Sequence, residues 1–199
     1  PQALEELRTE IRNLSVVETP SVPQLYVLVR SLEQLQGLLD WTPPDNLPGP
    51  AAVYCDFEDI RRYEAAVKLA RESAIRIGLA TIRVAKPFEE GWMRQIGSYA
   101  PDIVLIRNFA SLSYFQEHHP EIQLVGDYSL NVSNELTASL FHAQGFARQV
   151  PSYDLNWKQL QALLQRFPAP WFEQVVHQHM PMFHMEHCVF AATLSDGKD

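Results

Sequence analysis

The densest group of chemically versatile side chains lies in a short stretch near the end of the chain, VVHQHMPMFHMEHC, residues 175–188. Imidazole and thiolate groups bind transition metals, transfer protons and, in the case of cysteine, attack carbonyl carbons. His177 and His179 are two residues apart, so on a strand they would lie on one face. His184 and Cys188 are four apart, so on a helix they would be neighbours. The stretch fits a zinc site, a set of structural histidines, or a site for another cofactor.

Two of the more specific interpretations of this stretch are weak. The spacing of its histidines and cysteine matches no standard zinc finger. A thiol nucleophile at Cys188 would need a base oriented by a third group, and HMEHC alone does not supply one. Neither GxSxG nor HExxH occurs in the chain, so a serine hydrolase of that type or a zinc peptidase is not indicated.

Charged side chains also gather where apolar runs of the sequence end. Asp56 and Glu58 follow one run, Arg83 and Arg107 end two others, and Asp127 ends a fourth. A guanidinium at the end of a buried strand needs a carboxylate or an anionic ligand. Two alternatives follow for the arginines: they pair with these carboxylates, or they bind an anion of the substrate.

Smaller polar side chains follow the later runs. Asn131 and Ser152 lie in such segments and could hydrogen-bond a substrate. The same segments contain Asp154, Asn156 and Ser133, but Asp, Asn and Ser also favour the N-cap of a helix. Capping and substrate binding are therefore both open for Asp154.

These polar residues belong to a recurring pattern of apolar runs and amphipathic segments. The runs are rich in Val, Ile and Leu with little alternation, which is typical of parallel strands buried on both faces. We expect strands at 25–30, 51–57, 78–84, 102–108, 122–127, 146–152 and 172–179. Helices are expected between them: Ser31 with Gln34 and Asn156 with Gln159 fit capping boxes, and Gly145 suits a helix C-terminus.

Consecutive βα units of this kind form an α/β fold, either an open doubly wound sheet or a (β/α)8 TIM-type barrel. The even spacing and the lack of a glycine-rich phosphate loop favour the barrel, incomplete here with about seven parallel strands. We assign residues 1–22 to an N-terminal helix and linker and residues 23–199 to the partial barrel. In such folds the carboxyl ends of the strands form the functional face, so the polar residues should meet at the barrel mouth.

The composition is that of a soluble globular protein, with 46% hydrophobic and 20% charged residues. The net charge of -8 gives no overall basic footprint for nucleic acid. Two cysteines without a signal-like segment predict no disulfide framework and a cytoplasmic location. No apolar run approaches the roughly 18 residues that span a membrane. The chain begins at Pro1 and ends in LSDGKD, which we interpret as a piece of a longer protein.

Three segments resemble the peptidase U32 family, also called collagenase-like proteases: GDYSLNVSN (126–134), PSYDLN (151–156) and FEQVVHQHMPMFHMEHCVF (172–190). Glu173, His177 and Cys188 fall on matching positions. RVAKPFEEGWMRQ and VLIRNF are similar to the longer branch of that family. The resemblance implies a (β/α)8 barrel, of which this chain would be the C-terminal part.

The resemblance also implies a choice of activities. The family name implies proteolysis, whereas better-studied relatives hydroxylate a tRNA or ribosomal RNA base, or a quinone precursor, with a 4Fe-4S cluster. Our leading hypothesis is such an iron–sulfur enzyme; a peptidase acting on a peptide substrate and a non-catalytic, partner-binding barrel are the alternatives. We expect His177, His179 and Asp127 to be catalytic. Substrate binding is assigned to Asn131, Arg83, Arg107, Ser152, Asp154 and Glu173.

The resemblance makes Cys188 a ligand of the cluster in the full-length protein. The chain departs from the short family signature at Pro181, where a cysteine is expected, and at Gln178, where a glycine is expected. The longer branch has its other cysteines further on, which here would lie after Asp199. One ligand cannot hold a cluster, so we expect this fragment alone to bind none and to be inactive.

Overall fold

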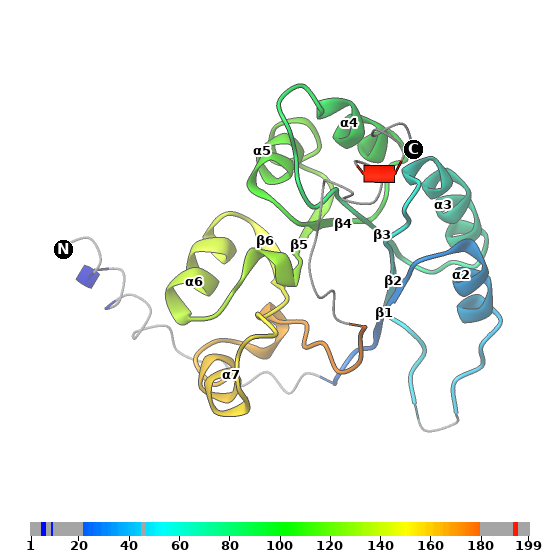
Figure 1. Cartoon of the computed structure of the whole chain (residues 1–199). Coiled ribbons are helices and arrows are strands. Elements are labelled where there is room, and N and C mark those ends of the chain that lie inside the picture. Colours follow the sequence, from blue (N-terminus) through cyan, green and yellow to red (C-terminus); the bar gives the residue numbers. More distant parts are fainter. Residues whose placement is uncertain (1–4, 7–8, 10–21, 45–46, 180–192, 195–199) are drawn as a thin grey trace.

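Strands and helices alternate along the chain in the computed structural model, which describes residues 5–6, 9, 22–44, 47–179 and 193–194 (Figure 1). The strands are β1 (Tyr26–Val29), β2 (Ala52–Cys55), β3 (Ile77–Ala80), β4 (Ile103–Ile106), β5 (Gln123–Gly126) and β6 (Phe146–Gln149). The helices are α2 (Leu32–Leu39), α3 (Tyr63–Glu72), α4 (Glu90–Ser98), α5 (Phe109–His118), α6 (Glu135–Ala143) and α7 (Trp157–Leu164). Short 3₁₀ turns are η1 (Ile60–Arg62), η2 (Tyr128–Leu130) and η3 (Ala169–Trp171).

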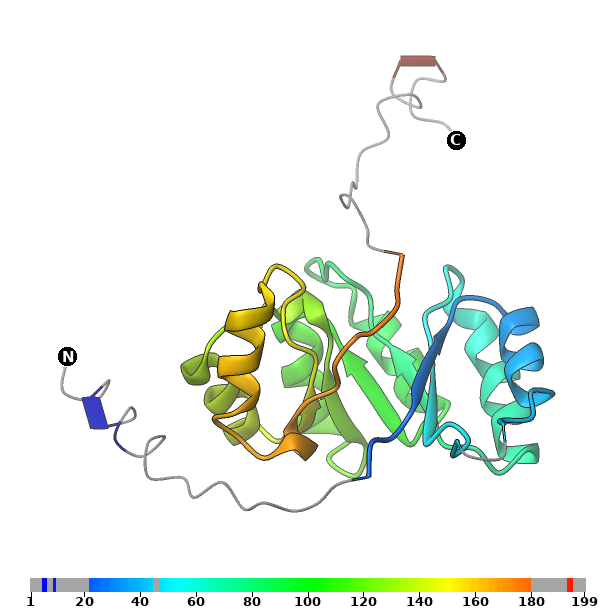
Figure 2. The same cartoon turned by 90° about the horizontal axis from the view of Figure 1, so that it is seen from below.

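The six strands of the described residues form one parallel sheet in the order β1-β2-β3-β4-β5-β6. Each strand pairs with the next along the chain, for example Val29 with Cys55 and Ile106 with Gly126. The sheet is curled, and the helices cover its outer side (Figures 1 and 2). This is the α/β arrangement of an incomplete TIM-type barrel, as the βα rhythm of the sequence predicted.

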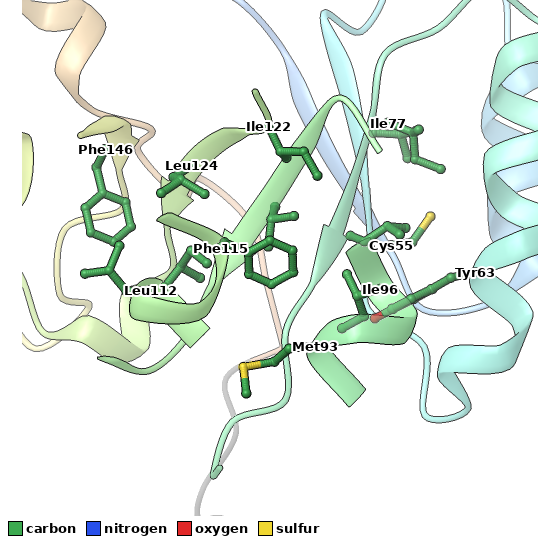
Figure 3. Close-up of a cluster of buried hydrophobic side chains, with 14 of the residues drawn as sticks. Cys55, Tyr63, Ile77, Met93, Ile96, Leu112, Phe115, Ile122, Leu124 and Phe146 are labelled. Atoms are coloured by element: carbon green, nitrogen blue, oxygen red, sulfur yellow. The ribbon is translucent and has the colours of Figure 1, made fainter. Parts of the chain in front are cut away.

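Both faces of the central strands are covered, which explains their continuous apolar sequences. Every residue of β2, β3 and β4 is buried. The larger core lies between the sheet and the helices, where Cys55, Tyr63, Ile96 and Phe115 meet (Figure 3). A smaller cluster on the inner face contains strand residues only: Ala52, Tyr54, Ala80, Ile103, Leu105 and Val125, with Tyr26 against it. In a barrel, side chains of the inner face line the interior, and those at the carboxyl ends of the strands form the mouth.

Helix ends follow the predicted signals with two corrections. Asn156 forms a full capping box with Gln159, and Gly145 follows α6 with a φ of 87°, a conformation that favours glycine. Ser31 caps α2, although the Gln34 side chain accepts from the backbone N–H of residue 30 instead. Asn134, one residue after the predicted Ser133, caps α6. Asp154 is not a cap either, because Asn156 is the N-cap of α7.

The predicted seventh strand, 172–179, is wrong. Phe172 makes an isolated parallel bridge with Gln149, and the Glu173 N–H donates to the Gln149 carbonyl at 3.1 Å, after which no strand continues. A strand needs a ladder and a face to bury, but β6 ends at Gln149 and Val176 is 89% exposed. The segment instead runs between the two edge strands toward the carboxyl ends of the sheet (Figure 2).

Some of the sequence predictions lie outside the described residues. They include most of the N-terminal helix and linker, and the part of the histidine-rich stretch from residue 180 to Cys188. In the described part of the chain, no helix has both the length and the apolar character needed to cross a membrane.

Candidate functional site

Three charged side chains meet on the inner face, just past the carboxyl ends of three strands. Asp56 follows β2, Arg107 follows β4 and Asp127 follows β5. Strand side chains alternate in direction, so each continues the inward series of its own strand. Arg107 Nη1–H donates to Asp56 Oδ1 at 2.6 Å, and its Nε–H donates to Asp127 Oδ2 at 2.9 Å. The arginine therefore bridges two carboxylates from opposite sides.

Backbone and hydroxyl groups fix this bridge in place. The Arg107 N–H donates to Thr81 Oγ1 at 3.0 Å, and Ser129 Oγ–H donates to the Arg107 carbonyl at 3.1 Å. Arg107 is 6% exposed and Asp127 3% exposed. A buried guanidinium with two carboxylate partners and satisfied neighbours has little freedom to move. We call Asp56, Arg107 and Asp127 the mouth triad.

The triad perturbs the acidity of its members. Burial raises the pKa of Asp127, and the charge of Arg107 opposes that rise without cancelling it. Burial also acts to raise the pKa of Asp56, but its hydrogen bond to Arg107 and the charges of Arg107, Arg30 and Arg83 outweigh burial and lower it. Burial disfavours the charged guanidinium, yet the two carboxylates raise the pKa of Arg107. The two aspartates thus differ in proton affinity, and Asp127 is the better proton acceptor.

Two further arginines flank the triad. Arg30 Nε lies 3.9 Å from Asp56 Oδ2, and the Arg83 guanidinium lies 5.3 Å from the centroid of the Tyr128 ring. Three arginines against two aspartates leave one positive charge in excess among these side chains. Of the two alternatives that the sequence left open, pairing with carboxylates is what Arg107 does here, with Asp56 and Asp127, whereas Arg83 lies over the Tyr128 ring.

Aromatic rings line the same rim. The rings of Tyr128 and Tyr153 are 5.1 Å apart between centroids, and Tyr153 is 39% exposed. The loops that carry them are tied by a parallel bridge between Val132 and Pro151. Tyr128 is itself buried, at 8% exposed, so Tyr153 is the ring of this pair that is open to stack on a flat aromatic ligand.

An open hollow of about 290 Å³ adjoins this rim. Its lining joins both charge signs to one aromatic ring: Arg30, Ser31, Phe57, Glu58, Asp59 and Arg62. Arg30 belongs both to the hollow and to the surroundings of Asp56. The volume is at the lower end of the range of small-molecule sites.

The other predicted rim residues are close to the triad in the chain but make local contacts. Asn131 is exposed, in a left-handed conformation with φ 53°, and ends η2. Ser152 is buried, and its hydroxyl oxygen accepts from the Asp154 N–H at 3.3 Å. Of these two short polar side chains, Asn131 is therefore open to solvent and Ser152 is enclosed in its loop.

Glu173 lies away from the rim, inside the curled sheet. Its Oε1 accepts from Tyr54 Oη–H at 2.6 Å and from Arg148 Nε–H at 2.5 Å. No sequence pattern indicated that Tyr54 in β2, Arg148 in β6 and Glu173, which are far apart in the chain, would meet. Arg148, Tyr54, Tyr128 and Arg30 are the residues that sequence reasoning missed.

His177 and His179 are both exposed, and their ring centroids are 6.1 Å apart with the planes nearly perpendicular. The two imidazoles are therefore neighbours although no strand places them. Cys188 lies outside the described residues.

The described residues do not fit an iron–sulfur cluster. Cys55 is fully buried in the outer core, and burial together with the nearby Asp56 charge raises its pKa to about 12, so it remains a protonated thiol (Figure 3). Cluster ligation needs thiolates. No group of three or more His, Cys, Asp or Glu side chains within the described ranges could hold a metal ion.

Curled parallel strands with outer helices and a charged rim at the strand ends define a barrel-type α/β protein, with the candidate site at the mouth. A sequence model of peptidase family U32 matches residues 54–199, well over half of the chain. The chain belongs to peptidase family U32.

Comparison with solved structures and curated proteins adds to this assignment. A solved structure, that of the U32 peptidase Mk0906, superimposes with a TM-score of 0.56 at 12% identity, covering 76% of this chain and 68% of that chain. At that identity the likeness concerns the fold. No curated protein matches the chain.

Proposed function

We propose that this chain is the substrate-binding part of a U32 enzyme that hydroxylates a flat aromatic substrate carrying negative charge, such as an RNA base within its phosphate backbone. The observation that carries the proposal is the rim of the mouth, where Arg83 lies over Tyr128 and Tyr128 contacts Tyr153. Guanidinium groups and aromatic rings side by side bind phosphates and stack on bases.

The mouth triad supports the same assignment. Asp127 is the better proton acceptor of the two aspartates and is held by Arg107. A carboxyl with a raised pKa can exchange a proton with a ring nitrogen or hydroxyl near neutral pH more readily than an ordinary one. Asp127 is therefore our candidate for proton transfer, with His177 and His179 as further candidates on the segment that ends near the strand ends.

The cofactor assignment comes from the family resemblance. A 4Fe-4S cluster in the full-length protein, with Cys188 as one ligand, would supply redox chemistry. The described residues would bind and orient the substrate.

Proteolysis is the second candidate, because the solved structure that superimposes on the chain is named a U32 peptidase. Cys55 does not serve as its nucleophile, since a buried thiol with a pKa of about 12 is not ionised near neutral pH. A peptidase activity would have to use other groups.

The two candidates are separated by one experiment on the full-length protein. We expect anaerobically purified protein to contain iron. RNA from cells that lack the protein should be missing one nucleoside that is heavier than its unmodified form by a single oxygen. Cys188→Ala should remove the iron and fail to restore the modified nucleoside, whereas Cys55→Ala, the matched control, should keep both. The hydroxylase proposal would be refuted if the protein is iron-free and cleaves peptides, and if cells that lack the protein have an unchanged nucleoside profile.

A further inference from the structure

A second polar network lies on the inner face, in the part of the sheet away from the mouth. Tyr54 comes from β2, Arg148 from β6, and Glu173 from the segment after η3. Besides its two bonds to Glu173 and Arg148, the Tyr54 ring lies 6.0 Å from that of Tyr26 in β1. The Arg148 guanidinium covers the Tyr26 ring at 4.8 Å. The network thus joins both edge strands of the sheet.

These contacts require the sheet to curl. In the strand order, β2 and β6 are separated by three other strands. Neighbouring strands are about 4.8 Å apart, so in a flat sheet the two backbones would be roughly 19 Å apart. Yet Arg148 Nη2 lies 3.5 Å from Tyr54 Oη, and Arg148 reaches Tyr26 on the opposite edge. Glu173 accepts hydrogen bonds from both Tyr54 and Arg148 and so lies between β2 and β6.

Phe172 packs against the core just before Glu173, but the chain after Glu173 has few contacts that fix it. Beyond the Glu173 N–H bond to the Gln149 carbonyl, the described segment up to residue 179 has no backbone pairing with the sheet. Val176, His177 and His179 are exposed. The side chain of Glu173, in contrast, is 9% exposed and that of Arg148 13%. The buried carboxylate is therefore the anchor of an otherwise weakly held segment.

The chemistry of the network favours geometry over raw stability. A buried ion pair gives up hydration of both charges, so replacement of the whole pair by apolar side chains is often neutral, whereas loss of one partner is costly. Burial and the adjacent Glu173 charge raise the pKa of Tyr54, so its hydroxyl stays a neutral donor to that carboxylate. Such a network therefore favours one arrangement of β1, β2 and β6 and one path of residues 173–179.

We propose that Tyr26, Tyr54, Arg148 and Glu173 form an internal clasp that holds the two edges of the curled sheet together and sets the path of residues 173–179 along the opening between them. Glu173 is a positioning residue in this proposal. It fixes where His177 and His179 lie relative to the mouth triad, whatever substrate binds there.

Backbone hydrogen exchange of the full chain, read for residues 173–179 and for β4 separately, tests the clasp. Glu173→Gln keeps the side-chain size but leaves the Arg148 charge without its counterion. Within 173–179 the Glu173 N–H is the amide that bonds to the sheet, and loss of a charged network bond should speed its exchange on the order of 100-fold while the β4 amides stay unchanged. Asp59→Asn, the same acid-to-amide change in the exposed pair with Arg61, should alter neither region.

A double replacement separates positioning from stability. Arg148→Met with Glu173→Leu removes the charges together, so the urea midpoint should return close to the parent value while 173–179 stays fast-exchanging. The imidazole NMR signals of His177 and His179 should move toward free-histidine positions in both Glu173 variants. The clasp is overturned if Glu173→Gln speeds exchange of the β4 amides and of the Glu173 amide by the same factor, or if the Glu173 amide exchanges no faster than in Asp59→Asn.

Discussion

Replacement of Arg107 by methionine tests whether the mouth triad is built as the structure indicates. Methionine retains the length of the side chain but leaves Asp56 and Asp127 without the donor that bridges them at 2.6 and 2.9 Å. Both contacts are nearly free of solvent screening, since the Arg107 side chain is 5% exposed. Breaking a buried ion pair at one partner costs about 3–5 kcal/mol, which for a chain of this size lowers Tm by roughly 6–20 °C.

The loss should depend on pH in a defined direction. In the parent protein Arg107 helps to lower the pKa of Asp56, so this carboxyl contributes stability above its unfolded pKa of about 3.9 and loses it as the pH falls. In the variant burial acts unopposed by Arg107 on both carboxyls, so the pKa of Asp56 rises above its unfolded value and that of Asp127, already raised in the parent, rises further. Ionisation then destabilises the variant at neutral pH, and protonation relieves the penalty. The difference in unfolding free energy should be largest at pH 7 and shrink toward pH 4.

Urea denaturation followed by circular dichroism at several pH values measures both effects. Arg61→Met is the matched control, because Arg61 is paired with Asp59 at 2.9 Å but its side chain is 79% exposed. An exposed pair contributes about 0–1 kcal/mol. If Arg107→Met costs no more than Arg61→Met, or if its cost grows as the pH falls, the description of the mouth triad is wrong.

Two further predictions concern the sheet. Gly78→Ala should lower stability by about 1–3 kcal/mol in urea denaturation, because the new Cβ would collide with the Tyr54 ring that Glu173 holds. Gly37→Ala, in an exposed helical position with open space around it, should instead raise stability by about 0.5–1 kcal/mol, and the opposite order of the two would contradict the packing. Cys55, with a pKa of about 12, should resist iodoacetamide at pH 8 in the folded chain and react in urea, as mass spectrometry of its peptide would show. Equal labelling in both states would mean that β2 is not packed as described.

The regular part of the fold was predictable because local signals and burial agree there. The strands with Cys55 and Ile106 were recognisable as continuous apolar runs, and both faces of each are covered. The mistaken strand at 172–179 had the same apolar start. Whether this segment forms a strand depends on what lies beside β6, and a sequence pattern does not contain that information.

The candidate site was predictable in its place but not in its partners. Polar residues at strand ends pointed to the mouth, and pairing of Arg107 with Asp56 and Asp127 was one of two alternatives. Tyr128 and Arg148 carried no comparable signal. Tyr128 follows β5 like any loop aromatic, and Arg148 lies inward because the pairing between β5 and β6 is irregular after Leu124. A one-residue shift in register reverses the direction of a strand side chain, so Arg148 could not be oriented from the sequence.

The two polar networks divide the inner face between anchoring and binding. A closed barrel of this type fills its interior with branched apolar side chains, and the inner cluster around Leu105 does so here. On one side of that apolar layer, Arg148 and Glu173 satisfy each other and face no open rim. At the strand ends, the mouth triad together with Arg30 and Arg83 leaves one positive charge in excess, beside exposed Tyr153. An anionic, aromatic ligand would complete the charge balance at the mouth but has no role in the clasp. Substitutions at Arg83 should therefore affect ligand binding, and those at Glu173 should affect the path of the chain.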